Sequence, residues 1–168
     1  MDFEKHIARA KVSSWGLKKL NLGLWFMIPF NKPHRIKIKK LEDDLVITQI
    51  PYKRKNMNHI KGIHACGLAT CAEFASGLLL LTKLNAKKYR LIMQSLDMEY
   101  LYQAKSDITA EFSVTDDWIK THVLDPLVEN DHVMVKCEIK LYDKDRNQVA
   151  VGHTNWQIKD WESVKTKL

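Results

Sequence analysis

One carboxylate interrupts a long apolar stretch of this chain. Residues 65–82 consist mainly of Ala, Cys, Leu and Phe, and Glu73 is their only charged residue. Burying a carboxylate in such surroundings is unfavourable unless something pairs with it or uses it, and burial raises its pKa. Thr70 and Ser76 lie three residues to either side, so on a helix the three residues share one stripe. Glu73 is therefore a candidate catalytic residue.

The segment before Glu73 can supply a second part of a site. It reads "GIHACG", with His64 between Gly62 and Gly67, and a helix that begins here presents its first amides without helical partners. Together with the helix dipole, such amides can hold an oxyanion that develops on a carbonyl group. Glu73 lies roughly 10–14 Å further along the same helix, too far to act on that carbonyl. Two helices packed antiparallel across a twofold axis would bring Glu73 of one chain to the helix start of the other.

Each of these residues also has a structural alternative. Glu73 could be satisfied by internal hydrogen bonds, His64 could brace the loop before the helix, and Asn58 could cap a turn. Cys66 could be a nucleophile whose pKa is lowered at the helix start. The residue types alone leave these alternatives open.

The elements that must position these residues can be read from periodicity. The apolar stretch predicts a helix over about 65–84 that is hydrophobic nearly all round and must be surrounded by other elements. The sequence also predicts a first helix from residue 2 to about 22, ended by Gly23, and a short helix over 117–124 that ends near Pro126. Alternating and β-branched segments predict a hairpin and four further strands; they are residues 35–41, 45–52, 96–102, 108–115, 133–141 and 148–158. This order predicts an α+β domain with about six antiparallel strands wrapped around the central helix.

Composition limits the other possibilities. The 168 residues, 45% hydrophobic and 28% charged, suit a single domain, with 1–30 as an N-terminal helical extension and 31–168 as the core. The N-terminal residues lack the apolar core of a signal peptide. The cysteines are three, an odd number, and lie in apolar segments, which is typical of reduced, buried thiols. Both features favour a cytoplasmic protein. The sequence contains no Gly-x-Ser-x-Gly, His-Glu-x-x-His or Cys-x-x-Cys motif, so we expect no metal site.

Two surface features remain open at this stage. The net charge is +7, and short basic clusters favour an anionic partner or simply form a solvated face. Residues 24–30, "LWFMIPF", could touch a membrane, cap a ligand tunnel or pack on the core. The basic clusters are Lys37/Lys39/Lys40, Lys53/Arg54/Lys55 and Lys87/Lys88/Arg90.

The spacing of the candidate residues resembles that of hotdog-fold acyl-CoA thioesterases, most closely the phenylacetyl-CoA and hydroxybenzoyl-CoA thioesterase branches. The residues that carry the pattern are Asn58, Gly62, His64, Ala65, Cys66 and Glu73. The later "LDMEYLYQAKSDITAEFSV" is similar to the third and fourth strands of those proteins, and the order of elements from 35 to 160 also fits. The first 30 residues resemble the extra N-terminal helix of an uncharacterised branch.

The resemblance implies roles for these residues. Glu73 would activate water or attack the thioester carbon, and the Cys66 amide, with Gly67 beside it, would polarise the carbonyl oxygen. Asn58 would orient water or substrate, and His64 would brace the loop. Gly62 and Thr70 would complete the substrate-binding region. The chain departs from the family at Ala65-Cys66, where the family has Gly-Gly, so a Cβ and a thiol crowd the approach of the thioester.

The resemblance also implies a function and partners. It implies hydrolysis of an acyl-coenzyme A at a site shared across a homodimer, with a tetramer as a further assembly. Coenzyme A would enter as part of the substrate, and no separate cofactor, nucleic acid or membrane insertion is expected. The alternative is a hotdog protein that binds acyl-CoA or fatty acid without catalysis, which the Ala65-Cys66 departure favours.

Overall fold

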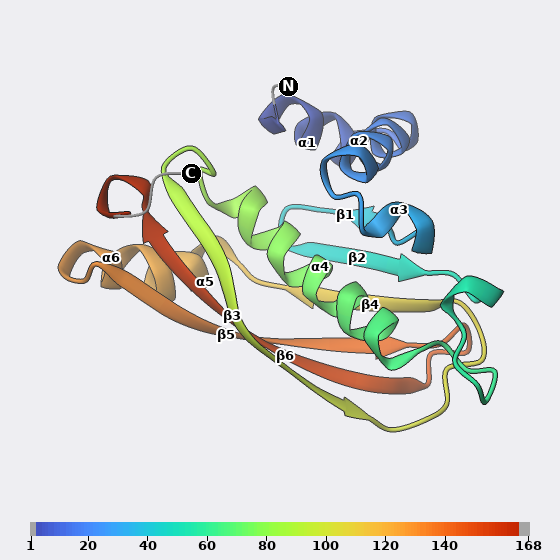
Figure 1. The fold of residues 1–168 in the computed structure, drawn as a ribbon. Coiled ribbons are helices and arrows are strands. Elements are labelled where there is room, and N and C mark those ends of the chain that lie inside the picture. Colours follow the sequence, from blue (N-terminus) through green and yellow to red (C-terminus); the bar gives the residue numbers. More distant parts are fainter. Residues whose placement is uncertain (1–2, 165–168) are drawn as a thin grey trace.

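A six-stranded antiparallel sheet curves around one long helix in the computed structural model, which describes residues 3–164 (Figure 1). The strand order is β1-β2-β4-β5-β6-β3. The strands are β1 (Lys37–Leu41), β2 (Leu45–Ile50), β3 (Tyr89–Tyr100), β4 (Ile108–Ser113), β5 (His132–Tyr142) and β6 (Gln148–Asp160). The helices are α1 (Phe3–Val12), α2 (Ser14–Met27), α3 (Asn31–His34), α4 (Ala65–Lys83), α5 (Asp116–Ile119) and α6 (Asp125–Glu129). This arrangement confirms the expected hotdog architecture.

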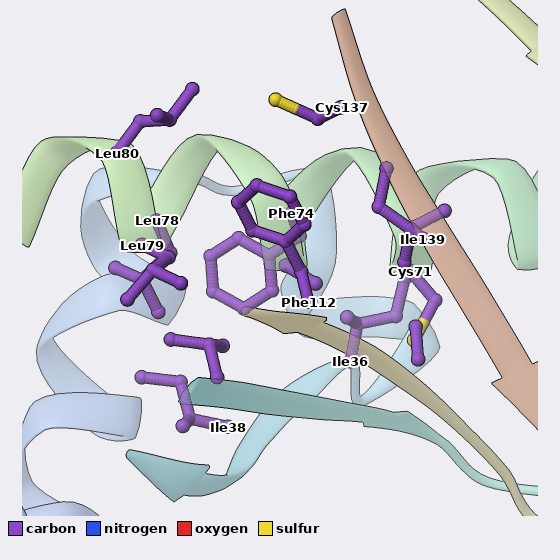
Figure 2. Packing of buried hydrophobic residues seen from close by; sticks show 14 of the residues in the cluster. Ile36, Ile38, Cys71, Phe74, Leu78, Leu79, Leu80, Phe112, Cys137 and Ile139 are labelled. Atoms are coloured by element: carbon purple, nitrogen blue, oxygen red, sulfur yellow. The ribbon is translucent and has the colours of Figure 1, made fainter. Parts of the chain in front are cut away.

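The central helix α4 forms because its neighbours cover it on nearly every side. Leu78, Leu79 and Leu80 are all buried, and three consecutive residues span about 200° of the helix circumference, more than a single apolar face. Figure 2 shows its buried side chains in one cluster with residues of the sheet, among them Phe112 and Ile139. Within residues 3–164, α4 is the one helix long and apolar enough to cross a membrane, and just over half of it is buried in the protein. Its composition is explained by its place inside the sheet.

The N-terminal segment differs from the single helix expected over 2–22. The helix is interrupted at Ser13, between α1 and α2. The Ser13 hydroxyl accepts a hydrogen bond from the Gly16 amide and so caps the start of a new helix. Gly23 was expected to end the helix, but α2 continues to Met27. No glycine in the described part of the chain has a positive φ, so Gly23 is an ordinary helical residue. Pro29, just beyond the helix end, fits the observed stop better.

Two further boundaries were predicted wrongly. β3 begins at Tyr89, well before residue 96. The earlier part was missed because a register shift between Met93 and Ser95 interrupts the alternating pattern of the strand. The short helix expected to end near Pro126 continues to Glu129. Pro126 lies in the first turn of α6, where a missing amide is tolerated, and the wider π turn Lys120–Leu124 precedes it.

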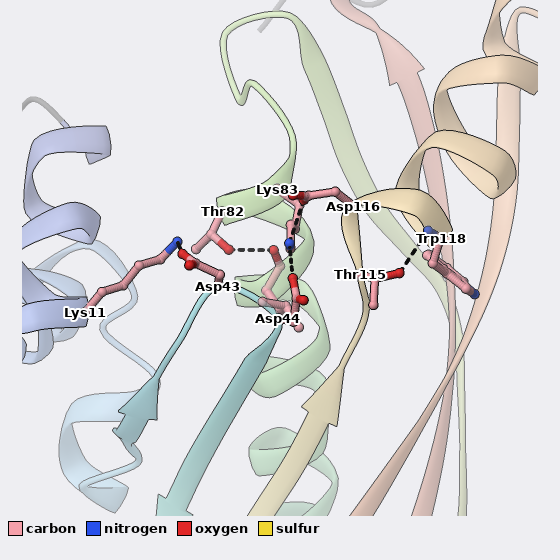
Figure 3. Close-up of polar contacts among 9 residues, drawn as sticks. Lys11, Asp43, Asp44, Thr82, Lys83, Thr115, Asp116 and Trp118 are labelled. Carbon is pink, nitrogen blue, oxygen red and sulfur yellow. Dashed lines mark hydrogen bonds and ion pairs between the residues drawn. The ribbon is translucent and has the colours of Figure 1, made fainter.

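A buried lysine ties the end of α4 to the rest of the fold. The side chain of Lys83 is 6% exposed and bonds Asp44, in the β1–β2 turn, and Asp116, 2.6 Å away at the start of α5 (Figure 3). Burial works against the charged form, but the two carboxylates raise the pKa of Lys83 overall. Lys11 of α1 reaches Asp43 of the same turn at 2.8 Å. The β1–β2 turn therefore anchors both the N-terminal helices and α4.

Candidate active site

Glu73 lies half-buried in the third turn of α4. Within residues 3–164, no hydrogen bond or ion pair reaches its carboxylate. Burial raises the pKa of the Glu73 carboxyl above its ordinary value of 4.5. Internal hydrogen bonding, the structural alternative for this residue, is therefore absent from the described part of the chain. An unpaired buried carboxylate in an apolar setting is an arrangement typical of functional sites.

The carboxylate lines an apolar cavity of about 710 Å³. Its walls come from the end of α2, one side of α4, the start of β3 and the last strand. Only Glu73 and Arg90 among the lining residues carry a charged side chain. The apolar lining includes Leu24, Met27, Phe74, Leu78, Leu91 and Trp156. A cavity of this size and lining suits an apolar group placed against the carboxylate.

A close contact between Gly77 and Trp156 forms one wall of the cavity. A Cβ atom on Gly77 would lie 2.9 Å from the indole ring, so only glycine lets the ring lie directly against α4, one turn from Glu73. The indole Nε1 donates to the Ser76 hydroxyl at 3.1 Å and to Thr154 at 3.0 Å. Thr154 also donates to Ser76 at 3.1 Å. Ser76 shares the stripe of Glu73 in sequence, but this buried network fixes its hydroxyl in a structural role.

The capping residue of α4 occupies backbone amides at the start of the helix. His64 is the N-cap, and its Nδ1 accepts a hydrogen bond from the Cys66 amide at 3.1 Å. The Gly67 amide donates to the His64 carbonyl at 2.9 Å, and the Thr70 hydroxyl donates to the Cys66 carbonyl at 2.8 Å. The two amides that the resemblance assigns to the thioester oxygen therefore already have partners within the chain.

Asn58 holds the turn that leads into this helix. Its Oδ1 accepts from the amides of Ile60, at 3.1 Å, and Gly62, at 3.0 Å. Lys61 within the turn has a φ of 59°, the left-handed conformation that such a tight turn requires. Both the side-chain oxygen of Asn58 and the Gly62 amide are thus engaged in shaping the loop.

The predicted site residues fall into two separate groups. Asn58, Gly62, His64, Cys66 and Gly67 gather around the start of α4, with Thr70 one turn on. Glu73 lies two turns from that start, roughly 10 Å along the axis, and faces the cavity. One chain therefore brings together the loop residues but does not bring Glu73 to them.

Sequence reasoning missed two cavity residues. Arg90 on β3 has a buried Nε with no hydrogen-bond partner in the described part of the chain, while its Nη2 donates to Gln157 at 3.0 Å. Trp156 lies in the last strand, β6, and its place in that strand did not distinguish it from other core residues. The one available signal was Gly77, because an isolated glycine inside a helix can mark a close approach by another group. Between residues 3 and 164, no three His, Cys, Asp or Glu side chains lie close enough to hold a metal ion.

Comparisons with known proteins find a matching family model and solved structures of the same fold. The family described as Domain of unknown function (DUF4442) matches residues 16–158. A protein of unknown function from Pseudomonas aeruginosa is 21% identical, with a TM-score of 0.76 over 95% of this chain and 97% of its own. A Staphylococcus aureus thioesterase is 17% identical (TM-score 0.63; 78% and 98% covered), and a Haemophilus influenzae thioesterase is 14% identical (TM-score 0.67; 86% and 90% covered). Comparison with curated proteins finds no match.

Proposed function

Because the chain belongs to the DUF4442 family and has the hotdog fold of solved thioesterases, we propose that it hydrolyses the thioester bond of an acyl-coenzyme A. The observation that carries this proposal is the unpaired Glu73 carboxylate at the wall of an apolar cavity. The acyl group would occupy the cavity and present its thioester carbon to Glu73.

The carboxylate is suited to either of two routes. As a general base it takes a proton from water while the oxygen attacks the thioester carbon. As a nucleophile it forms an anhydride with the acyl group, which water then hydrolyses. In both routes the carbon–sulfur bond breaks, the sulfur leaves as a thiolate that takes up a proton, and the acyl group leaves as a carboxylate.

A second copy of the chain would complete the site. β3 is twelve residues long and, within residues 3–164, pairs only with β6, so no described strand covers its other edge. Ile92 and Tyr100 on this strand are exposed, and a long unpaired edge with apolar side chains favours pairing with another strand. A twofold pairing of β3 edges would set two α4 helices side by side and bring each Glu73 towards the other chain's helix start.

The spacing of substituted residues in a neighbour supports Asn58 and Glu73 as a functional pair. Two solved structures of the Staphylococcus aureus protein carry alanine in place of a glutamine and of a glutamate, respectively, and the two positions are fifteen residues apart. Asn58 and Glu73 have the same separation. The exposed Lys53, Arg54 and Lys55 lie next to the Asn58 turn and suit the phosphates of coenzyme A.

Light scattering on the purified protein tests the shared site. We expect a mass of about twice the 19.6 kDa of one chain, or a larger even multiple. We expect this assembly because a strand of a partner chain would cover the exposed β3 edge. A strict monomer at the concentrations used for activity assays would contradict a site built from two chains.

One observation favours a second candidate function, binding of acyl-CoA or fatty acid without hydrolysis. The Cys66 amide donates to His64, and Ala65-Cys66 stands where the acyl-CoA thioesterases that the sequence resembles have Gly-Gly. A site without a free amide would hold the acyl group in the cavity but stabilise an oxyanion poorly.

An acyl-CoA panel of graded chain length separates these candidates. Hydrolysis is followed by thioester absorbance, because thiol reagents would also react with the exposed Cys66. We expect saturable turnover that depends on chain length, since the apolar cavity selects the acyl group. Saturable binding without turnover for every substrate would establish the non-catalytic alternative, and neither binding nor turnover would exclude both.

A further inference from the structure

The outward face of α2, together with the end of α1 and the turn after α2, has properties that the proposed hydrolysis does not explain. We propose that this face, defined by Val12, Trp15, Leu22, Phe26, Met27 and Phe30, binds reversibly to the surface of an anionic lipid bilayer. In Figure 1, α1 and α2 lie at one side of the molecule, and no other element lies beyond them. The face is therefore free to meet a flat surface.

The first observation is the exposure of large apolar side chains. The six residues range from 54% exposed at Leu22 to 86% exposed at Val12. Trp15, Leu22 and Phe26 are spaced by seven and four, so they lie on one side of α2. The opposite side, Gly16, Leu20 and Leu24, is buried against the protein. Packing explains only the inward side of this helix.

The second observation is the charge around these residues. Residues 13–41 contain seven basic residues and no acidic one, and the nearest acidic residues, Glu42 and Asp43, lie beside Val12 at one end of the face. Lys18 and Lys19 flank the line of Trp15 and Leu22, and the Lys19 ammonium lies 3.4 Å from the centre of the Trp15 ring. Lys32 lies 4.8 Å from the centre of the Phe26 ring. The basic residues are Lys18, Lys19, Lys32, Arg35, Lys37, Lys39 and Lys40, of which Lys40 is paired with Glu42 at 2.7 Å.

Aromatic side chains bordered by lysines match the chemistry of a bilayer interface. Rings of Trp and Phe insert at the level of the headgroups, while lysines on long stems reach anionic headgroups. A twofold contact between two copies through this face would instead set lysines against lysines, which is unfavourable. The charge therefore favours an anionic bilayer over a second copy as the occupant of this face.

The position of the face links it to the cavity. Leu24, Met27 and Ile28, at the end of α2, line the same cavity as Glu73. Met27 and Ile28 are also exposed, so the rim of the cavity borders the proposed docking face. On a bilayer, an acyl chain held in the lipid would have a short path to Glu73. This last consequence rests on the proposed function, whereas the docking itself does not.

Vesicle co-sedimentation tests the docking. The full chain is mixed with vesicles of phosphatidylcholine alone or of phosphatidylcholine with phosphatidylserine. We expect binding to the anionic vesicles that weakens as salt is raised. The double variant Trp15→Ser/Phe26→Ser is expected to lose at least roughly tenfold in partitioning. Lys18→Gln/Lys19→Gln should lose roughly 10- to 30-fold, since each lysine near the surface contributes about fivefold.

Matched controls distinguish this face from general effects of the substitutions. Val128→Ser removes an equally exposed apolar residue elsewhere, and Lys120→Gln/Lys144→Gln removes the same charge elsewhere. Both should bind vesicles as the unaltered chain does. Glu73→Gln should also bind normally, so a failure of hydrolysis and a failure of docking are separable. Circular dichroism and thermal unfolding verify that every variant folds.

Three outcomes would overturn the proposal. The first is no binding of the unaltered chain to anionic vesicles. The second is binding that the Trp15→Ser/Phe26→Ser variant retains in full. The third is a lower assembly mass for that variant by light scattering, which would assign the face to a contact between copies of the chain.

Discussion

Replacement of Glu73 with glutamine is expected to lower thioester hydrolysis by about 10²–10⁴-fold, the usual contribution of a positioned base, while the cavity still binds the acyl group. Glutamine keeps the shape of the side chain but neither takes up a proton nor attacks carbon. Rates on the best substrate of the panel and its equilibrium binding measure the two effects separately. Glu129→Gln, which removes an exposed carboxylate on α6, is the matched control and should leave the rate unchanged.

The pH dependence gives the same prediction a second readout. A base must be ionised, so activity should fall on the acid side with an apparent pKa above 4.5, the ordinary value for glutamate, because burial raises the pKa of Glu73. A wild-type rate that Glu73→Gln leaves intact would remove Glu73 from the chemistry. An acid limb at or below the ordinary pKa would show that another group controls it.

The raised pKa also has a defined effect on stability. A carboxyl whose pKa is higher in the folded than in the unfolded chain destabilises the fold once it ionises. The free energy of unfolding of Glu73→Gln, relative to the unaltered chain, should therefore increase as the pH rises from 4.5 through the raised pKa. Well below pH 4.5 the glutamate of the unaltered chain and the glutamine of the variant are both neutral, so the difference in the free energy of unfolding should be small.

Leu79→Ala is expected to reduce the free energy of unfolding by about 2–5 kcal/mol. Leu79 is fully buried in the middle of α4, where the sheet surrounds the helix and its neighbours leave little freedom to close a void. Leu81→Ala makes the same change two residues on, at a half-buried position on the cavity wall. It should lower the free energy of unfolding by clearly less.

Denaturant titrations of the two leucine variants measure this difference. Both must be compared at one protein concentration, because the stability of an assembled protein depends on it. Equal losses for the two variants would contradict the picture of a helix whose middle is fully buried except where it faces the cavity.

Much of the fold was readable from local patterns, and the failures have tertiary causes. The uniformly apolar run 65–82 and the alternation in β4, β5 and β6 predicted the central helix and the sheet around it. The start of β3 was missed because a register shift between Met93 and Ser95 hides the period of two. The break at Ser13 was missed because the apolar pattern continues across it, and only the cap to Gly16 divides the two helices.

The candidate site was less predictable than the fold. The isolated charge at Glu73 and the glycines around His64 pointed to two candidate segments, which one chain leaves roughly 10 Å apart. The hydrogen bond from the Cys66 amide to His64 depends on a side-chain rotamer, which spacing does not encode. Arg90 and Trp156 reach the cavity from strands distant in sequence, so no local pattern could have joined them to Glu73.

The position of β3 in the sheet also affects how the chain must be made. β3 ends at Tyr100, but its one partner strand in the described part of the chain, β6, begins at Gln148. Translation at about 5–20 residues per second leaves β3 without that partner for on the order of 2–10 s. During this interval both edges of a long strand are open, and a chaperone or another nascent copy can meet it first. A chain cut short before β6 would never pair β3, so synthesis must nearly finish before the sheet can close around α4.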